Sequence, residues 1–282
     1  MQGEKELLVA SFGTSYNESR AKTIGAIEEA LKEAFPDYSV CRGFTSGMIV
    51  KHLRERDGIR IDTVREALEQ AAAAGVRTLL VQPTHMMSGF EYQDLRKEIE
   101  GCSGRFERIV LGAPLLASAE DFDVLLAAII ADTAEFDDGR TAICFMGHGT
   151  QAESNRVYAS LQKKLAEKGL FHYYIGTVEA NPTLGDLVEK VGAGNYTRVV
   201  LQPLMIVAGA HANNDMAGAG KDSWKSVFEA HGYEVLPVLR GLGELPTIQQ
   251  LFVRHAREAA ERIEQDASMS RQSLHKRADL SA

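Results

Sequence analysis

The chain has 282 residues, of which 45% are hydrophobic and 25% charged, a composition typical of globular proteins rather than disordered ones. Its length exceeds one typical domain and fits two of moderate size. The formal net charge is −8 and no long run of Lys or Arg occurs, which argues against a nucleic-acid partner. No stretch approaches the ~20 apolar residues that a membrane span needs. The apolar run at residues 7–10 is too short for a secretory signal, so we expect a cytoplasmic protein.

The cysteines agree with that location. Cys41, Cys102 and Cys144 form no CxxC pair, and their number is odd. Cys41 and Cys144 lie in apolar, strand-like runs, which favours free thiols over disulfides or metal ligands. Free thiols are typical of a reducing compartment.

Short apolar runs alternate with longer amphipathic stretches through the first half of the chain. The apolar runs predict strands at LLVASF, YSVCRGF, TLLVQPTHMM and RIVLGAPLL. The amphipathic periodicity predicts helices over about 19–35, 63–74, 91–100 and 119–134. Gly75 follows the second of these helices as a C-terminal capping residue. This alternation predicts a parallel sheet with helices on both faces.

A polar turn, EFDDGRT at 135–141, separates this half from a second run of the same order. Strands are expected at AICFMG, FHYYIGT, RVVLQP and EVLPVL. Helices are expected over about 154–168 and 223–231, within TLGDLVEKVGAG, and over about 246–264. The polar tail at 266–282 is expected to fray.

The second run reads as an internal repeat of the first. When VQPTHMMSGFE (81–91) is aligned with LQPLMIVAGAH (201–211), Glu91 falls on His211. When SFGT (11–14) is aligned with GHGT (147–150), Phe12 falls on His148. Two matches in the same order indicate a duplication. We therefore predict two similar Rossmann-like α/β halves, 1–136 and 137–265.

Four polar side chains stand where predicted strands end. They are His148, Glu179 and His211 in the second half and Glu91 in the first. Ligands of open α/β sheets bind outside the carboxyl ends of the strands, so these side chains are candidates for a site. The glycines around His148 let the chain turn sharply and leave room beside the imidazole.

Each of these residues also has an ordinary structural explanation. A strand-end histidine is often a hydrogen-bonded structural residue, and Glu179, before Asn-Pro, could cap a turn or a helix. His85 aligns with Met205 in the repeat, so we interpret His85 as structural. The remaining histidines are interpreted as surface or packing residues: His52, His172, His231, His255 and His275.

Taken together, the second-half residues suggest a metal. Two imidazoles and a carboxylate that leave coordination positions open suit a divalent first-row ion. The three residues are far apart in the sequence and form no regular motif. The residues alone therefore leave both the metal site and the structural explanation open.

Several longer motifs carry a family resemblance. LLVASFGTSY, RGFTSGMIVKHLRERDGIRIDT, FMGHGT, LQPLMIVAGAHANNDMAG, DSWK and GLGE occur in collinear order. Together they resemble the anaerobic sirohydrochlorin cobaltochelatases, which are single-subunit, ATP-independent tetrapyrrole chelatases. The resemblance runs from about Leu7 to about His255. It implies two α/β halves with a cleft between them, and insertion of Co²⁺ into sirohydrochlorin in anaerobic cobalamin synthesis.

The resemblance also implies roles for the four candidate residues. His148 matches the histidine that removes a pyrrole proton and binds metal, and Glu179 and His211 match the other metal-contacting positions. Glu91 matches a catalytic carboxylate across the cleft, linked to metal selection or proton removal.

The substrate of such an enzyme is a polycarboxylate. Backbone N–H groups of Gly13, Thr14 and Ser15 at a strand end could bind a carboxylate. Arg42, Lys51 and Arg54 are our candidate cationic partners, although a solvated surface role fits each of them equally well. No GxxxxGKS or GxGxxG motif occurs, so we expect no nucleotide and no cofactor besides the substrate metal.

Other functions share the same residues. A chelatase for Fe²⁺ or Ni²⁺ would use the same ligand types, which accept several first-row metals. A carrier of tetrapyrrole or metal would share the cleft without turnover, and a phosphate-binding α/β protein would use only the GHGT loop. A homo-oligomer is left open, because an apolar helix face serves a core or a partner equally well.

Overall fold

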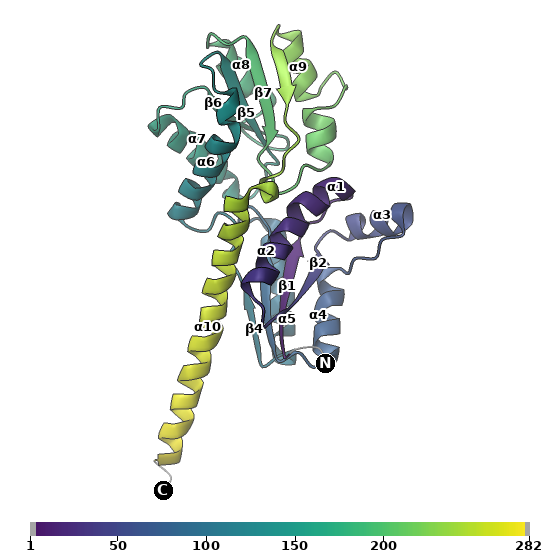
Figure 1. Cartoon of the computed structure of the whole chain (residues 1–282), viewed down its shortest axis with the longest axis vertical. Coiled ribbons are helices and arrows are strands. Elements are labelled where there is room, and N and C mark those ends of the chain that lie inside the picture. Colours follow the sequence, from purple (N-terminus) through teal and green to yellow (C-terminus); the bar gives the residue numbers. More distant parts are fainter. Residues whose placement is uncertain (1–3, 280–282) are drawn as a thin grey trace.

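The structure is a computed structural model and describes residues 4–279, with side chains as far as residue 265. Two α/β lobes lie one above the other in Figure 1, and one long helix runs from their junction along the lower lobe. The first lobe holds strands β1 (Lys5–Ser11), β2 (Ser39–Phe44), β3 (Thr78–Pro83) and β4 (Arg108–Leu111). The second holds β5 (Thr141–Gly147), β6 (Tyr173–Thr177), β7 (Arg198–Pro203) and β8 (Glu234–Pro237).

The two sheets have the same topology. Their strand orders are β2-β1-β3-β4 and β6-β5-β7-β8, and every strand pair is parallel. The register repeats as well, since Gln82 pairs with Val9 and Gln202 pairs with Phe145. The predicted parallel α/β fold and the internal duplication are therefore confirmed.

Helices cover both faces of the sheets. The first half contains α1 (Asn17–Arg20), a π-helical segment (Ala21–Gly25), α2 (Ala26–Ala34), α3 (Gly47–Asp57), α4 (Val64–Ala73), α5 (Phe90–Cys102) and α6 (Ala119–Thr133). The second contains α7 (Arg156–Glu167), α8 (Leu184–Gly192), a π-helical segment (His211–Met216), α9 (Trp224–Ala230) and α10 (Pro246–Asp279). Capping boxes start α4, α6 and α8, and Gly75 follows α4 with a φ of 78°.

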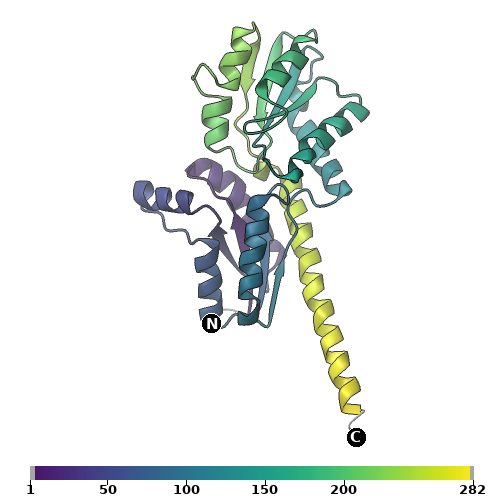
Figure 2. The same ribbon diagram turned by 180° about the vertical axis from the view of Figure 1, so that it is seen from behind.

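Two helices cross between the lobes. Although α6 precedes the predicted boundary at 136/137, it lies with the second lobe (Figure 2). Its Thr133 hydroxyl is 3.2 Å from the Tyr173 hydroxyl, and its Asp123 accepts from Lys164 at 2.7 Å. Helix α10 returns from the second half and packs against α2, β3 and β4 of the first lobe. The predicted boundaries at 136/137 and 265 therefore remain a proposal for the limits of the sequence repeat. The lobes do not follow these limits, because each includes a helix from the other half.

One hydrophobic core joins the lobes. Val9 of β1, Phe145 of β5, Leu125 of α6 and Phe252 of α10 belong to the same buried cluster. Alternate strand residues face away from it, and Leu8 lies in a separate cluster on the outer face of the first sheet. Because the central core contains residues from both lobes, we expect the lobes to unfold together.

Helix α10 is longer than its sequence indicates. It was expected to end near residue 264, with a frayed tail from 266, but it continues to Asp279. No Gly or Pro interrupts residues 247–279, so nothing in that stretch strongly opposes a helix. Residues 280–282 of the predicted tail lie outside the described residues. Among the described helices, none has the length and apolar character needed to cross a membrane.

Candidate active site

A cleft of about 530 Å³ lies between the two lobes. Its walls are the segments that follow β1 and β3 of the first sheet and β5, β6 and β7 of the second. The strands of both sheets therefore direct their carboxyl ends toward the same space, which is where open α/β sheets bind ligands. The predicted cleft between the halves is present.

Three of the predicted residues meet on the second-lobe wall. His148, Glu179 and His211 each offer a ligand atom, and these atoms all lie within 4.8 Å of one another. The rings of His148 and His211 are 4.7 Å apart between centroids and stand at 89° to each other. The Glu179 backbone N–H donates to the His148 carbonyl at 2.9 Å, which holds the two loops together. Two imidazoles and a carboxylate at this spacing can coordinate one divalent ion.

Hydrogen bonds fix one nitrogen of each imidazole. Nδ1 of His148 lies 2.8 Å from the Gly149 carbonyl oxygen, which can only accept, so Nδ1 carries the proton. Nδ1 of His211 lies 2.7 Å from Oδ2 of Asp215. In both rings Nε2 is therefore the nitrogen whose lone pair is left for a metal or a proton.

The glycines beside His148 have a steric reason. Gly149 has a φ of 84°, and a Cβ there would lie 2.8 Å from the Ala180 backbone nitrogen. A Cβ on Gly147 would lie 2.3 Å from a ring carbon of Tyr158, whose hydroxyl accepts from the Gly149 N–H at 3.2 Å. Residues with side chains would push the loop away from its supports and displace His148.

The first-lobe wall carries the other predicted residues. Glu91, in the first turn of α5, lines the cleft but lies outside the three-residue cluster. Gly13, Thr14 and Ser15 also line it. Arg54 lies on α3 and is not part of the cleft wall, so its contact with substrate stays a prediction.

Two arginines other than the predicted cations contact the loop of residues 13–15. Arg20 donates to the Thr14 carbonyl at 3.3 Å, and Arg56 donates to the Ser15 carbonyl. Among the residues that the structure describes, no Lys or Arg lines the cleft itself. These two guanidinium groups support the loop through its carbonyls, and Arg56 also pairs with Asp57, which offsets part of its charge.

Comparison with known proteins places the fold and the family. The structure of SirB from Bacillus subtilis with Fe³⁺ aligns with a TM-score of 0.66 over 92% of this chain and 97% of that one. At 13% sequence identity, this likeness concerns the fold. The family model "Cobalt chelatase (CbiK)" matches residues 5–261.

The chain belongs to the cobalt chelatase (CbiK) family.

Two curated relatives agree with this assignment. The sirohydrochlorin cobaltochelatase of Salmonella typhimurium is 39% identical over 94% of this chain and 100% of its own length. The sirohydrochlorin cobaltochelatase CbiKC of Nitratidesulfovibrio vulgaris is 32% identical over 93% of this chain and 92% of its own length. The sequence-based recognition of the family is confirmed.

Sequence reasoning missed the apolar walls of this CbiK-family cleft. Phe12 and Phe90 line it with 47% and 59% of their surface exposed, which is unusual for phenylalanine. Further apolar side chains in the wall are Met86, Met87, Leu204, Met205, Ile206 and Val207. The repeat alignment held a signal, because it placed Phe12 at the position equivalent to His148. A flat, apolar ring system suits such walls.

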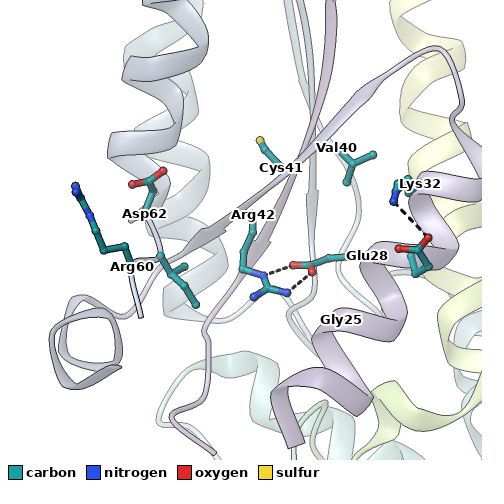
Figure 3. A pocket seen from close by; sticks show the side chains of 10 residues that line it. Gly25, Glu28, Lys32, Val40, Cys41, Arg42, Arg60 and Asp62 are labelled. Carbon is teal, nitrogen blue, oxygen red and sulfur yellow. Dashed lines mark hydrogen bonds and ion pairs between the residues drawn. The ribbon is translucent and has the colours of Figure 1, made fainter. Parts of the chain in front are cut away.

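A second pocket, of about 400 Å³, lies beside the edge strand β2 (Figure 3). Arg42 points across it and binds the Glu28 carboxylate through two nitrogens, while Lys32 pairs with Glu29 at 3.4 Å. Arg60 and Asp62 line its other side. Because Arg42 and Lys32 already bind carboxylates, this pocket has a weaker claim to a ligand than the cleft between the lobes.

Burial of His85 is expected to make the free energy of unfolding depend on pH. Neither ring nitrogen has a hydrogen-bond partner among the described residues, and burial lowers the pKa of His85 to about 4. Below the unfolded-state pKa of about 6.5, the unfolded chain binds a proton that the folded chain does not, so stability falls as pH falls. Between pH 7 and pH 4 we expect wild type to lose roughly 3 kcal/mol more than His85→Leu.

Urea denaturation of both proteins at pH 7 and pH 4 measures this difference. The other titrating groups are common to the two proteins and largely cancel in the comparison. Equal losses in wild type and His85→Leu would show that His85 titrates normally in the folded state.

Proposed function

We propose that this chain is a sirohydrochlorin cobaltochelatase, a lyase that inserts Co²⁺ into sirohydrochlorin in the anaerobic cobalamin pathway without a nucleotide. Membership in the CbiK family and relatives of that activity at 39% and 32% identity support the reaction. The observation that carries the proposal is the cluster of His148, Glu179 and His211 on the wall of a large apolar cleft.

The reaction exchanges one dication for two protons. The free-base macrocycle carries two inner N–H groups, and both protons must leave as Co²⁺ binds the four nitrogens. In this proposal, His148, Glu179 and His211 hold the partly dehydrated metal beside the ring, so that its transfer is local. Once the metal passes to the ring, the lone pair on Nε2 of His148 is free and accepts one pyrrole proton as general base, and Glu91 accepts the other from the opposite wall.

The ring and its substituents meet different parts of the cleft. We place the apolar ring against Phe12, Phe90 and the methionines of the walls. The peripheral carboxylates then reach toward the rim, where the N–H groups of residues 13–15 stand above Arg20 and Arg56. Largely apolar walls suit a macrocycle whose metal-binding centre must stay dry, and backbone N–H groups suit its carboxylates.

The contact of Arg56 with the loop of residues 13–15 leads to a prediction for substrate binding. Arg56→Ala is expected to raise KM for sirohydrochlorin about 3- to 10-fold and to leave kcat within about twofold, because Arg56 supports binding rather than chemistry. Steady-state kinetics at saturating Co²⁺ measure both constants. Arg65→Ala is the matched control, since Arg65 is an exposed arginine of α4 bound to Glu98. If Arg54→Ala raised KM and Arg56→Ala did not, Arg54 would be the partner instead.

The identity of the physiological metal is the finer part of the proposal. Imidazole and carboxylate ligands accept Co²⁺, Fe²⁺ and Ni²⁺, so the ligand set does not choose between them. Anaerobic assays with each metal, at equal free concentration and with excess sirohydrochlorin, test the choice. We expect the highest kcat/KM with Co²⁺. A higher value with Fe²⁺ or Ni²⁺ would identify the chain as a chelatase for that metal.

We also propose a cytoplasmic location. Its support is that Cys41, Cys102 and Cys144 are all free, with Cys144 fully buried and the other two half-buried.

A further inference from the structure

Asp215 lies four residues after His211 on the π-helical segment His211–Met216. Its Oδ2 is 2.7 Å from Nδ1 of His211, the shortest distance at which either histidine of the cluster contacts a fixed partner. Asp215 does not belong to the cluster of candidate ligands itself. Its carboxylate bonds Nδ1 and leaves Nε2 free.

The internal repeat shows that this carboxylate is particular to the second lobe. His211 is equivalent to Glu91, so Asp215 is equivalent to Leu95, which is 2% exposed and packs in the outer core of the first lobe. In the second lobe, Ala212 and Met216 supply the buried contacts of the corresponding turn. Asp215 is left at the surface beside His211, and its packing contribution is small.

The backbone conformation of the two lobes also differs at these equivalent positions. The first lobe starts a regular α-helix at Phe90, whereas the second lobe forms a π-helical turn over His211–Met216. Such wide turns occur frequently at functional sites, because they re-aim side chains. Within this turn the imidazole and the carboxylate share one hydrogen bond, and His211 lines the cleft.

We propose that Asp215 is a positioning residue that holds His211 with Nε2 directed at the incoming metal; this inference rests on the proposed metal site. A carboxylate on the distal nitrogen of a ligating histidine fixes the tautomer and ring orientation and strengthens the imidazole as a donor. In His148 the corresponding hydrogen bond from Nδ1 goes to the neutral Gly149 carbonyl. Asp215 therefore makes His211 the stronger of the two imidazole donors.

Titration of metal-free protein with Co²⁺ alone tests the inference. The visible absorption bands of protein-bound Co²⁺ report affinity and coordination without any tetrapyrrole. Asp215→Ala is expected to weaken Co²⁺ binding about 10- to 100-fold. Asp215→Asn keeps an accepting oxygen and should recover part of the affinity. Asp222→Ala, at an exposed aspartate of the following loop, is the control and should bind as wild type does.

Kinetics supply a second readout. In Asp215→Ala we expect KM for Co²⁺ to rise in parallel with the loss of affinity, while kcat at saturating Co²⁺ changes less than about threefold. A purely structural role would lower the melting temperature and would not be relieved by saturating metal.

The outcomes separate this inference from the proposed function. If His211→Ala loses Co²⁺ binding and Asp215→Ala stays within twofold of wild type, the role of Asp215 is overturned and the metal site stands. If Asp215→Asn binds as weakly as Asp215→Ala, positioning by the hydrogen bond alone is overturned. If His211→Ala itself binds Co²⁺ normally, the proposed metal site fails.

Discussion

Replacing His148 by alanine is expected to lower the rate of Co²⁺ insertion into sirohydrochlorin by about 10²- to 10⁴-fold. The variant loses both a metal ligand and the proposed general base, and the other imidazole of the cluster, His211, is assigned to the metal. The fold should be unaffected. The side chain of His148 is 44% exposed and does not belong to a hydrophobic core cluster of the described residues.

A matched histidine controls for this substitution. His231, at the end of α9, is exposed and also bonds a backbone carbonyl through Nδ1, at 2.8 Å from the Val227 oxygen. His231→Ala should keep wild-type turnover within about twofold, as expected of an exposed site away from the cleft. Near-normal turnover of His148→Ala, with an unchanged circular dichroism spectrum, would rule out the role given to His148.

Phe252→Ala is expected to destabilise the whole chain by about 3–5 kcal/mol. Phe252 lies on α10, is fully buried, and belongs to the core that contains Val9 of the first sheet and Phe145 of the second. Removing its ring leaves a cavity at the point where α10 joins the lobes. Because the core is shared, both lobes should lose their structure in one transition at lower denaturant concentration.

Two signals test this cooperativity. Trp224 is the single tryptophan and is buried in the second lobe, so its fluorescence reports that lobe, while circular dichroism reports all helices. In wild type and in Phe252→Ala we expect the two urea curves to coincide. Glu261→Ala, at an exposed site of α10, should change stability by less than about 0.5 kcal/mol. Separate fluorescence and circular dichroism transitions would show that the lobes unfold independently.

Features that depend on residues close together in the sequence could be predicted. The apolar runs, the capping motifs and the repeated order of strands and helices each depend on neighbouring residues, and they led to the two parallel sheets. The strand-end positions of His148, Glu179 and His211 followed from the same pattern, because parallel strands bring their carboxyl ends to one edge of a sheet.

Features that depend on distant packing could not be predicted. The exchange of α6 and α10 between the lobes leaves no periodic signal, since an apolar helix face looks the same whichever sheet it covers. The exposed rings of Phe12 and Phe90 in the cleft could not be predicted, because exposure is not visible in a sequence. The contact of Arg56 with the Ser15 carbonyl could not be predicted, because nothing in HLRERDG tells which arginine turns back toward that loop.

The central claim is that the cleft of this CbiK-family chain catalyses Co²⁺ insertion rather than merely binding the ring or the metal. The most direct test is the number of product molecules formed per chain, measured anaerobically by absorption with sirohydrochlorin and Co²⁺ both in large excess over protein. We expect conversion of many equivalents per chain, faster than in the absence of protein. Conversion that stops at one equivalent, or that is no faster than without protein, would contradict it.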